Sequence, residues 1–333
     1  LAQMYESING EIKQSVTTIN SYAEQIAGLN DRIGIAQAST GQPANDLLDS
    51  RDHLVAELNK LIKARTSSNS DGSINVFVGS GQQLVVGSQS IGLATTVSAS
   101  DPSRLVVGLK SGAGVQEMPE TLINGGALGG LVTFRRESLD RVSSDLGRNA
   151  VSLALTFNAQ SALGQDLLGQ SLLSPPPSGF SPAMFSVTEP VVLANAKNPA
   201  SSPTVSAAFV TPIPFGGNFY TDLGVSDYRL SGDASGVVLT RLSDNKQWAG
   251  GDVGAINTLL ASDPQGFTLS ASGSLPAGAS YLIQPTRDAA RKITVNPALV
   301  ADPRLIPAGG PVRTSAGTGN SGSGQISAGA VGP

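Results

Sequence analysis

Two arginines stand where a helical pattern calls for apolar side chains. Arg51 follows Leu47 and Leu48 by one turn on the apolar stripe of residues 45–62, and Arg135 interrupts the stripe of a later helical pattern. A guanidinium on a helix seam can fix the register of packed helices through an acidic partner. It can instead lay its stem along the seam and extend its charged head into water. The sequence leaves both interpretations open for each arginine.

Residues 45–62 predict an amphipathic helix whose apolar face a partner surface must cover. We expect that face to pack mainly within its own subunit, against a first and a third helix. We expect Asn45 to be the N-cap, because its short side chain can accept from the exposed first-turn amides. The pattern points to assembly rather than to catalysis. The predicted structural and assembly motif comprises Asn45, Asp46, Leu47, Leu48, Asp49, Arg51, Asp52, Leu54, Leu58 and Arg135.

Few residues could carry catalysis or hold a metal. His53 is the only histidine and cysteine is absent, so neither a multi-histidine metal site nor a thiolate site can form within this sequence. Asp46, Asp49 and Asp52 lack the loop spacing that surrounds calcium, and helix capping and solvation explain them better. Other acidic residues lie in turn-like contexts and predict no glycosidase pair, namely Asp222, Asp227, Asp233, Asp244 and Asp252. We therefore predict no catalytic, cofactor or metal residues.

These residues need helices and strands to position them. Apolar residues recur every three or four positions over residues 1–33, which predicts one long helix, and the break at residues 41–43 predicts an antiparallel hairpin with the helix of residues 45–62. Short strand patterns follow at residues 74–78, 84–86 and 105–107. A helical stripe returns at Leu128, Leu131, Leu139, Val142, Leu146, Ala150, Leu153 and Phe157. Beyond a polyproline-type break at residues 174–177, further strand runs occur at residues 191–193, 228–230, 237–239, 267–269 and 281–283.

We therefore predict an α+β multidomain fold, with a long-helix bundle and inserted, mainly antiparallel β domains. The 333 residues exceed the size at which one core keeps growing. Residues 1–66 with 125–170 are expected to form a discontinuous helical domain. Residues 67–124 and 171–312 are expected to form one or two β domains in total, and residues 313–333 a flexible Gly/Ser-rich linker.

Composition narrows the classes of partner. A net charge of −4 without a basic cluster indicates neither a nucleic acid nor an anionic membrane as partner. No apolar run is long enough to predict a transmembrane helix. Leu1 lies inside a helical pattern without an initiator methionine, which predicts that the chain is a fragment of a longer protein.

Several blocks of the chain resemble one family, that of flagellar hook-associated protein 1, which joins hook to filament in bacterial flagella. The most distinctive block is residues 43–54. Other matching blocks are residues 8–12, 23–30, 125–126, 129–131, 157–160, 164–167 and 285–291. The resemblance implies a secreted, non-enzymatic motility protein at the extracellular hook-filament junction, exported by the flagellar type III apparatus. Implied partners are copies of itself, the hook protein, hook-associated protein 3 and an export chaperone that binds a C-terminal part beyond this chain. Because the family's tube-forming terminal helices lie beyond it too, we expect this fragment to be monomeric.

Two other classes of function compete with a junction subunit. A surface adhesin or carbohydrate-binding module could be built on the β domains, but Trp248 is the only tryptophan and aromatic residues make up 5% of the chain. A cell-wall hydrolase would need a convergent acid pair, which the sequence does not indicate. Both alternatives therefore rank below assembly.

Overall fold

The computed structural model describes residues 1–112, 114–172, 180–212 and 222–309. It confirms the α+β fold class, with long helices and several antiparallel sheets. The chain divides into two compact units, Leu1–Val142 and Ser143–Pro333. The boundary between the units falls inside one helix. The sequence analysis instead places domain boundaries at the ends of helical patterns, and that division into a helical domain and β regions stays a prediction. No helix of the described part is both long and apolar enough to cross a membrane.

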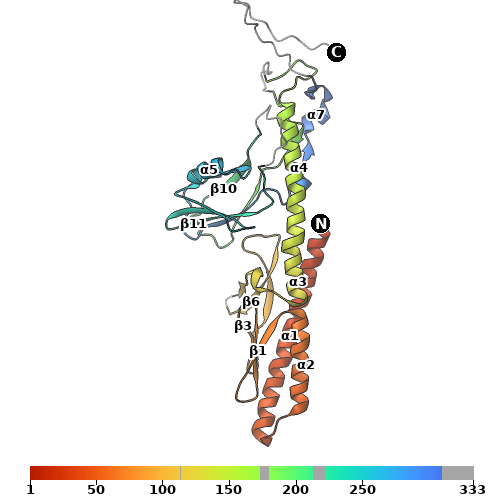
Figure 1. Ribbon diagram of the computed structural model, residues 1–333, viewed down its shortest axis with the longest axis vertical. Helices are drawn as coiled ribbons and strands as arrows, with labels where there is room; N and C mark the ends of the chain where they lie inside the picture. Colours follow the sequence, from red (N-terminus) through yellow and green to blue (C-terminus); the bar gives the residue numbers. More distant parts are fainter. Residues whose placement is uncertain (113, 173–179, 213–221, 310–333) are drawn as a thin grey trace, which may run out of the picture. The chain divides into compact units, whose positions relative to one another are not determined.

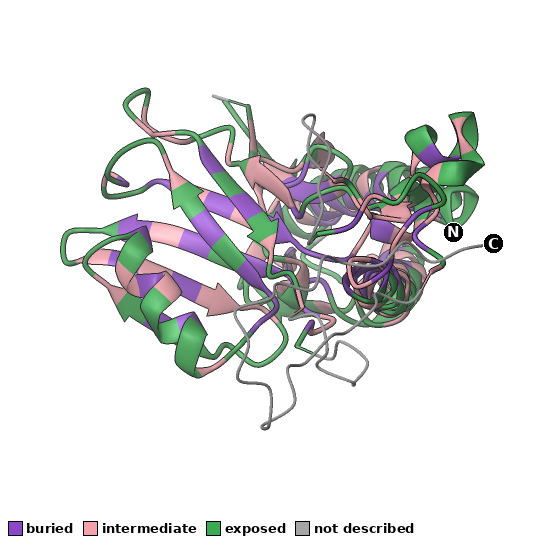
Figure 2. Ribbon diagram, turned by 90° about the horizontal axis from the view of Figure 1, so that it is seen from above, coloured by how far each residue is buried: buried purple, intermediate pink, exposed green. Residues whose placement is uncertain are grey.

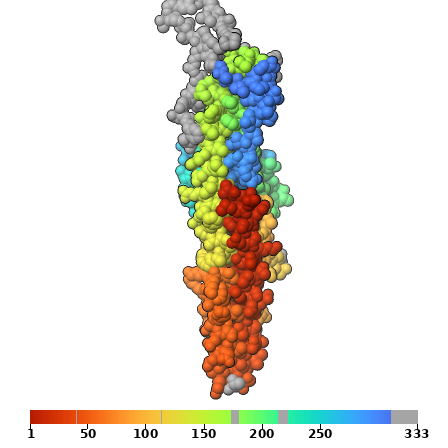
Figure 3. Space-filling view, turned by 90° about the vertical axis from the view of Figure 1, so that its right-hand side faces the viewer, coloured from red at the N-terminus to blue at the C-terminus, as the bar shows by residue number. Residues whose placement is uncertain are grey.

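The first unit begins with a helical hairpin. Helix α1 (Ala2–Thr40) ends at Gly41, whose left-handed φ of 64° lets its amide cap the carbonyl of Gln37. Helix α2 (Asn45–Leu61) returns beside α1 as an antiparallel partner (Figure 1), and the two adjoin each other on the surface of Figure 3. The seam of α1 is buried at Ile8, Ile12, Val16, Ile19, Ile26 and Ile33, as its spacing predicts, whereas Leu1 and Met4 at its start are exposed.

The prediction that Asn45 is the N-cap of α2 is wrong. Leu48 donates its amide to the carbonyl of Ala44 at 3.0 Å, so Ala44 is the N-cap and Asn45 already has helical backbone. An N-cap side chain reaches the first-turn amides only from a non-helical residue, and Asn45 makes no such bond.

Two antiparallel sheets complete the first unit. One has the order β1-β2-β3-β4 and the other β5-β6-β7. The strands are β1 (Ala64–Ser68), β2 (Ile74–Val78), β3 (Gln82–Val86), β4 (Gln89–Ser90), β5 (Leu93–Val97), β6 (Leu105–Ser111) and β7 (Gly114–Glu117). Alternate β2 residues join one core with the buried faces of α1, α2 and α3. Strand β1 starts inside residues 1–66, which were predicted to belong to the helical domain. The sequence does not indicate this strand, because β1 is an exposed edge strand without an apolar pattern.

The third helical pattern is interrupted by a π turn. A 3₁₀ turn, η1 (Glu120–Leu122), precedes α3 (Gly126–Phe134), and the π segment η2 (Arg135–Leu139) leads into α4 (Asp140–Ser161). The stripe expected to be buried is exposed along α4 at Val142, Leu146, Leu153 and Phe157. Instead, α4 buries a face with Ser144, Gly147, Val151, Ala154 and Leu155. The π turn adds a residue to the helical repeat, which shifts the buried face away from the one that uninterrupted counting predicts.

The second unit centres on a five-stranded antiparallel sheet of order β13-β12-β11-β15-β9. Its strands are β9 (Val191–Ala194), β11 (Tyr228–Asp233), β12 (Gly236–Arg241), β13 (Gln247–Gly250) and β15 (Ser280–Gln284). The pair β10 (Val205–Phe209) and β14 (Phe267–Ala271) and the helix α5 (Val253–Ser262) share its core. Figure 2 shows buried residues alternating with more exposed ones along the strands.

Shorter elements finish the described part of the second unit. They are β8 (Phe185–Ser186), paired with β16 (Thr294–Val295), then α6 (Ala289–Lys292), α7 (Pro297–Ala301) and η3 (Pro303–Leu305). The five strand runs predicted in this region are confirmed, whereas α5 was missed. Its start carries a signal in Asp252, whose carboxylate accepts from the amide of Ala255 at 2.8 Å as an N-cap. The predicted polyproline break and the linker at residues 313–333 lie outside the described residues.

Helix α4 packs closely against the backbone of the residues that follow β15. Ser143 donates its hydroxyl to the carbonyl of Arg287 at 2.6 Å. One turn later, a Cβ on Gly147 would overlap the carbonyl group of Thr286. Backbone atoms rather than flexible side chains occupy that space, so only glycine permits this approach. The block of residues 285–291 that resembles the family therefore holds the loop after β15 against α4.

We predict that Gly147→Ala destabilises the second unit by about 1–3 kcal/mol, the usual range for overpacking. The matched control is Gly130→Ala in α3, where an added Cβ meets no atom within 4 Å. That control should be neutral or stabilising by up to about 1 kcal/mol, because alanine favours helix. Urea denaturation followed by circular dichroism compares the two variants. Equal midpoints for both would contradict the close approach.

Candidate functional site: buried arginines between helices and sheets

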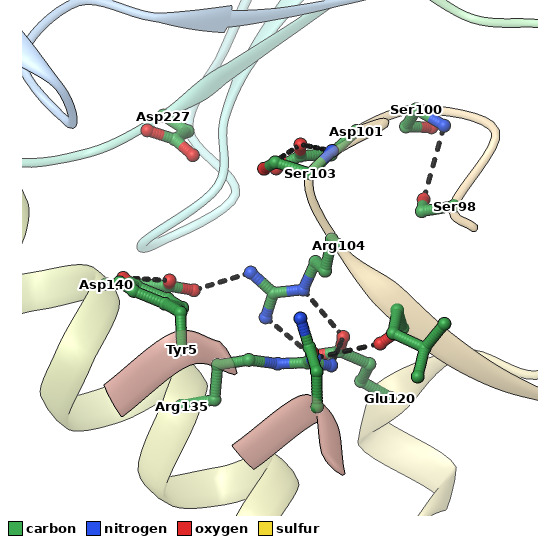
Figure 4. Close-up of polar contacts among 12 residues, drawn as sticks. Tyr5, Ser98, Ser100, Asp101, Ser103, Arg104, Glu120, Arg135, Asp140 and Asp227 are labelled. Atoms are coloured by element: carbon green, nitrogen blue, oxygen red, sulfur yellow. Dashed lines mark hydrogen bonds and ion pairs between the residues drawn. The ribbon is translucent and has the colours of Figure 1, made fainter. Parts of the chain in front are cut away.

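Five residues of the first unit form a polar group that we call the Arg104 network (Figure 4), in which Arg135 and Asp140 are buried and the other three are half-buried. It comprises Tyr5, Arg104, Glu120, Arg135 and Asp140. Arg104 donates two hydrogen bonds to Glu120, from Nε to Oε1 at 2.7 Å and from Nη2 to Oε2 at 2.8 Å. Its Nη1 donates to Oδ2 of Asp140 at 2.7 Å, and the Tyr5 hydroxyl donates to Oδ1 of Asp140 at 2.8 Å. Two arginines and two carboxylates thus offset each other away from bulk water.

Arg135 is the most enclosed member of the network, with 1% of its surface exposed. Its Nη2 donates to Oε1 of Glu120 at 2.7 Å, so it has an acidic partner, the first of the two interpretations. Its Nη1 donates to the Asn9 side chain at 3.0 Å and to the Leu105 carbonyl at 2.8 Å. Arg135 therefore connects the π segment η2 to α1, to β6 and to the turn that carries Glu120.

Local turns position Arg104 and Glu120. Asp101 accepts from the Ser103 amide at 3.0 Å and from its hydroxyl at 2.6 Å, which closes a turn immediately before Arg104. Strand β6 then carries the chain away from Arg104. Glu120 stands at the start of η1, after Pro119, where the 3₁₀ turn directs it toward both arginines.

The π turn is what brings Arg135 and Asp140 into one network. Residues five apart in an α-helix point in directions about 140° from each other. Here the Asp140 amide donates to the Arg135 carbonyl, five residues back, which is the π repeat. That repeat stacks the two residues one above the other, so both can reach Arg104 and Glu120. A regular helix would turn one of them away.

Charge state follows from these contacts. Burial disfavours the ionised form of Glu120, but Arg104 and then Arg135 hold its pKa below the ordinary value of 4.5. Burial also disfavours a charged Arg104, yet Glu120 and Asp140 raise the pKa of its guanidinium. For Arg135, burial and the neighbouring charge of Arg104 lower the pKa against the pull of Glu120. Glu120 is thus held ionised at neutral pH, which suits a structural anchor better than a proton donor.

A second buried group, the Arg51 cluster, lies between α1, α2 and the sheet of β1 to β4. Arg51 Nη1 donates to the Gly72 carbonyl at 2.8 Å and lies 3.4 Å from Oδ1 of Asn30. Asn30 donates to the carbonyls of Ile74 and Gly87 at 2.7 and 2.6 Å, and accepts from the Ile74 amide at 3.1 Å. The acid that approaches Arg51 is Asp52, whose Oδ1 lies 3.9 Å from Nε and whose side chain is exposed. A backbone carbonyl, rather than a buried acid, therefore holds Arg51.

The structure separates the predicted motif into two places. Arg51 and Leu58 are buried on α2, where Arg51 belongs to the Arg51 cluster, whereas Arg135 belongs to the Arg104 network. Leu47, Leu48 and Leu54 are half-buried, while Asn45, Asp46, Asp49 and Asp52 are exposed. Their role as one assembly motif stays a prediction. Asn30, Arg104, Glu120 and Asp140 were missed; only Asn30 carries a signal, as an amide on the apolar seam of α1. Within the described residues, no group of three or more histidine or acidic side chains is placed to hold a metal ion.

Removing the shared carboxylate tests the Arg104 network. We predict that Glu120→Gln costs about 3–5 kcal/mol of unfolding free energy, because it leaves the buried Arg135 and the half-buried Arg104 with too little negative charge. The matched control is Glu137→Gln, which alters an exposed pair with Arg136. That change should cost less than about 1 kcal/mol. Urea unfolding at neutral pH gives both values, and similar costs would show that the network contributes little.

The same pair of proteins gives a pH test. Because the folded-state pKa of Glu120 is depressed, its contribution is present above the ordinary value of 4.5 and is lost as pH falls through the folded-state pKa. The stability gap between wild type and Glu120→Gln should therefore be largest near neutral pH and shrink on acidification below 4.5. All other carboxylates are shared, so the difference isolates Glu120. A gap that stays constant with pH would contradict this assignment.

Comparison with known proteins begins with a family model. Residues 1–172, more than half of the chain, match the flagellar hook-associated protein FlgK helical domain. This range contains both arginine clusters.

Two curated relatives and one solved structure agree. Flagellar hook-associated protein 1 of Salmonella typhimurium is 37% identical over 242 residues, covering 72% of this chain and 41% of the relative. The protein of the same description from Escherichia coli K12 is 34% identical over 286 residues, covering 85% and 48%. The chain thus spans less than half the length of these relatives. The flagellar hook junction protein FlgK from Burkholderia pseudomallei aligns with 98% of this chain and 55% of its own, with a TM-score of 0.75 and 36% identity.

The resemblance found in the sequence is thereby confirmed by the family model, by the relatives and by the fold. The chain belongs to the FlgK family of flagellar hook-associated proteins.

Proposed function

We propose that this chain is part of a structural subunit that joins the hook to the filament of a bacterial flagellum. The observation that carries the proposal is the alignment of almost the whole chain with a solved flagellar hook junction protein. The buried charged groups support a non-enzymatic role, because the Arg104 network and the Arg51 cluster connect helices to strands within the first unit. Relatives described as flagellar hook-associated proteins support the same role.

We place this subunit outside the cell, at the hook-filament junction, after secretion by the type III apparatus. Copies would pack laterally and axially through their helices, because repeated heterologous contacts build a helical lattice. The hook protein and hook-associated protein 3 would adjoin the ring on its two sides. An export chaperone would act on a part of the protein beyond this chain, and the isolated chain would be monomeric.

The domain division and the assembly motif belong to the same proposal. Residues 1–66 with 125–170 would form the helical layer, with residues 67–124 and 171–312 as β regions. Support comes from the core of the first unit, in which α3 packs with α1 and α2 although seven β strands separate it from them in sequence. The Arg51 cluster and Arg135 would stabilise this layer rather than touch neighbouring subunits.

Exposed apolar residues of α4 are the proposed contacts with a neighbouring copy. Val142, Leu146, Leu153 and Phe157 lie on one side of the helix and are 47–53% exposed. Exposed apolar residues gathered on one face are typical of a surface that contacts another protein. By contrast, Leu58 is fully buried within its own unit, so a charge placed there would test folding rather than assembly.

We predict that Leu146→Asp with Leu153→Asp, in the whole protein, prevents junction formation. Burying unpaired carboxylates at an apolar contact costs several kcal/mol, so filament number should fall at least ~10-fold and filament protein should leak into the medium. Both sites are exposed, so the fold should persist. The control is Arg141→Asp, exposed on α4 about 100° away from the stripe. Normal filaments with the double variant, at equal export, would contradict the proposed contact.

The structure weakens the alternative of a carbohydrate-binding module. Trp248, the only tryptophan of the sequence, is 6% exposed. Its Nε1 donates to Asp263 at 3.0 Å, and the ammonium of Lys246 lies 5.2 Å from the ring centroid. The ring is thus engaged within the second unit and presents no open face for sugar stacking.

A further inference from the structure

The first unit has a basic cavity that the proposed function does not use. It has a volume of about 380 Å³ and is lined by Lys63, Arg65, Phe77, Ser80 and Asn124, among others. Arg65 pairs with Phe77 across β1 and β2, which puts both side chains on one face of the sheet. The Lys63 amide donates to the Asn124 carbonyl at 3.2 Å, which closes the rim. The cavity therefore has an aromatic wall and two cations from adjoining segments.

Neither cation has an acidic partner within the described residues. The side chains of Lys63 and Arg65 form no ion pair or hydrogen bond with the described part of the chain. Two unpaired cations in one concave site attract a carboxylate, and the fork of arginine can hold one through two bonds.

Unpaired carboxylates stand at the opposite end of α2. Asp46 and Asp49 are exposed on its first two turns, and neither side chain forms an ion pair with the described residues. Helix α2 has 17 residues, so it is about 25 Å long. Asp46 and Asp49 therefore cannot reach the cavity of their own molecule. A second copy of the chain can supply them.

We propose that Asp46 and Asp49 of one copy dock into the Lys63 and Arg65 cavity of the next. Because the two surfaces differ, the contact is heterologous and can repeat from copy to copy without closing into a dimer. The proposal rests on the proposed junction function and names an axial contact for it. Exposed ion pairs of this kind orient partners more than they bind them, so the contact sets the stagger of copies within a lattice.

The absence of cysteine from the sequence makes disulfide trapping specific. One variant carries Asn45→Cys, beside the acids, and a second carries Ser80→Cys, in the cavity wall. Mixed under mild oxidation, they should form a heterodimer faster than either forms a homodimer. The control pairs Ser80→Cys with Thr17→Cys, which is exposed on α1. Raising NaCl from about 50 to 500 mM should slow the specific reaction, because salt screens exposed charges.

A charge swap decides between specific docking and collision. Lys63→Glu with Arg65→Glu in the Ser80→Cys variant should slow trapping at least ~10-fold through like-charge repulsion. Asp46→Lys with Asp49→Lys in the Asn45→Cys variant should restore it. All four sites are exposed, and circular dichroism should confirm that each variant is folded. Trapping that ignores the charges, or that the swap fails to restore, overturns the proposal.

The whole protein in motile cells separates this inference from the proposed function. Lys63→Glu with Arg65→Glu should reduce filament number, and the reciprocal swap in the same chain should recover it. If the cavity variant assembles normally, the axial contact is wrong while the junction function stands. If the cavity variant fails and the reciprocal swap does not rescue it, the cavity accepts another partner's acid, and the second copy is wrong as its occupant.

Discussion

The carboxylate of Glu120, held between Arg104 and Arg135, is the interaction on which the first unit depends. Buried arginines are unfavourable unless geometry and counter-charge are both supplied. Glu120 supplies them to two arginines at once, at 2.7 Å each, from a short turn before the third helix. Asp140 can complete the charge balance only because the π turn places it beside Arg135. A local irregularity of the helix is therefore part of the electrostatics, and the helix would have to lose these contacts to become regular.

Helix α1 provides the frame on which these contacts are arranged. Its apolar seam packs non-specifically in principle, because similar Ile and Val residues repeat along it. Polar side chains at intervals remove that freedom. Tyr5 donates to Asp140, and Asn9 accepts from Arg135. Asn20 exchanges two hydrogen bonds with the backbone of Leu93, and Asn30 bonds to the carbonyl of Gly87 and accepts from Arg51. Sliding the sheets along the helix would break all of these bonds together, so the polar residues specify register while the apolar ones stabilise it.

The sequence predicts the features that depend on periodicity. It does not predict contacts between residues that are distant along the chain. The seam of α1 and the strand runs follow from spacing alone, and Arg51 and Arg135 were recognised because each breaks a stripe. The carbonyl of Gly72 as partner of Arg51 has no sequence signal, since any residue offers a carbonyl. The buried face of α4 differs from the predicted one, because counting at 3.6 residues per turn does not detect a π turn. Interruptions of a pattern could thus be found in the sequence, but their partners could not.

The charged residues of the first unit divide into two groups with different physical consequences. Glu120 and its two arginines are largely buried, so salt screens their interaction less than it screens exposed pairs, and they can maintain one geometry within the first unit. Lys63, Arg65, Asp46 and Asp49 are exposed, so any pairing between them is weak and reversible for one contact. A lattice repeats each contact many times, and weak contacts between rigid units then suffice while still permitting correction during assembly. Shielded ionic contacts within the unit and exposed charges on its surface therefore suit the proposed role in assembly.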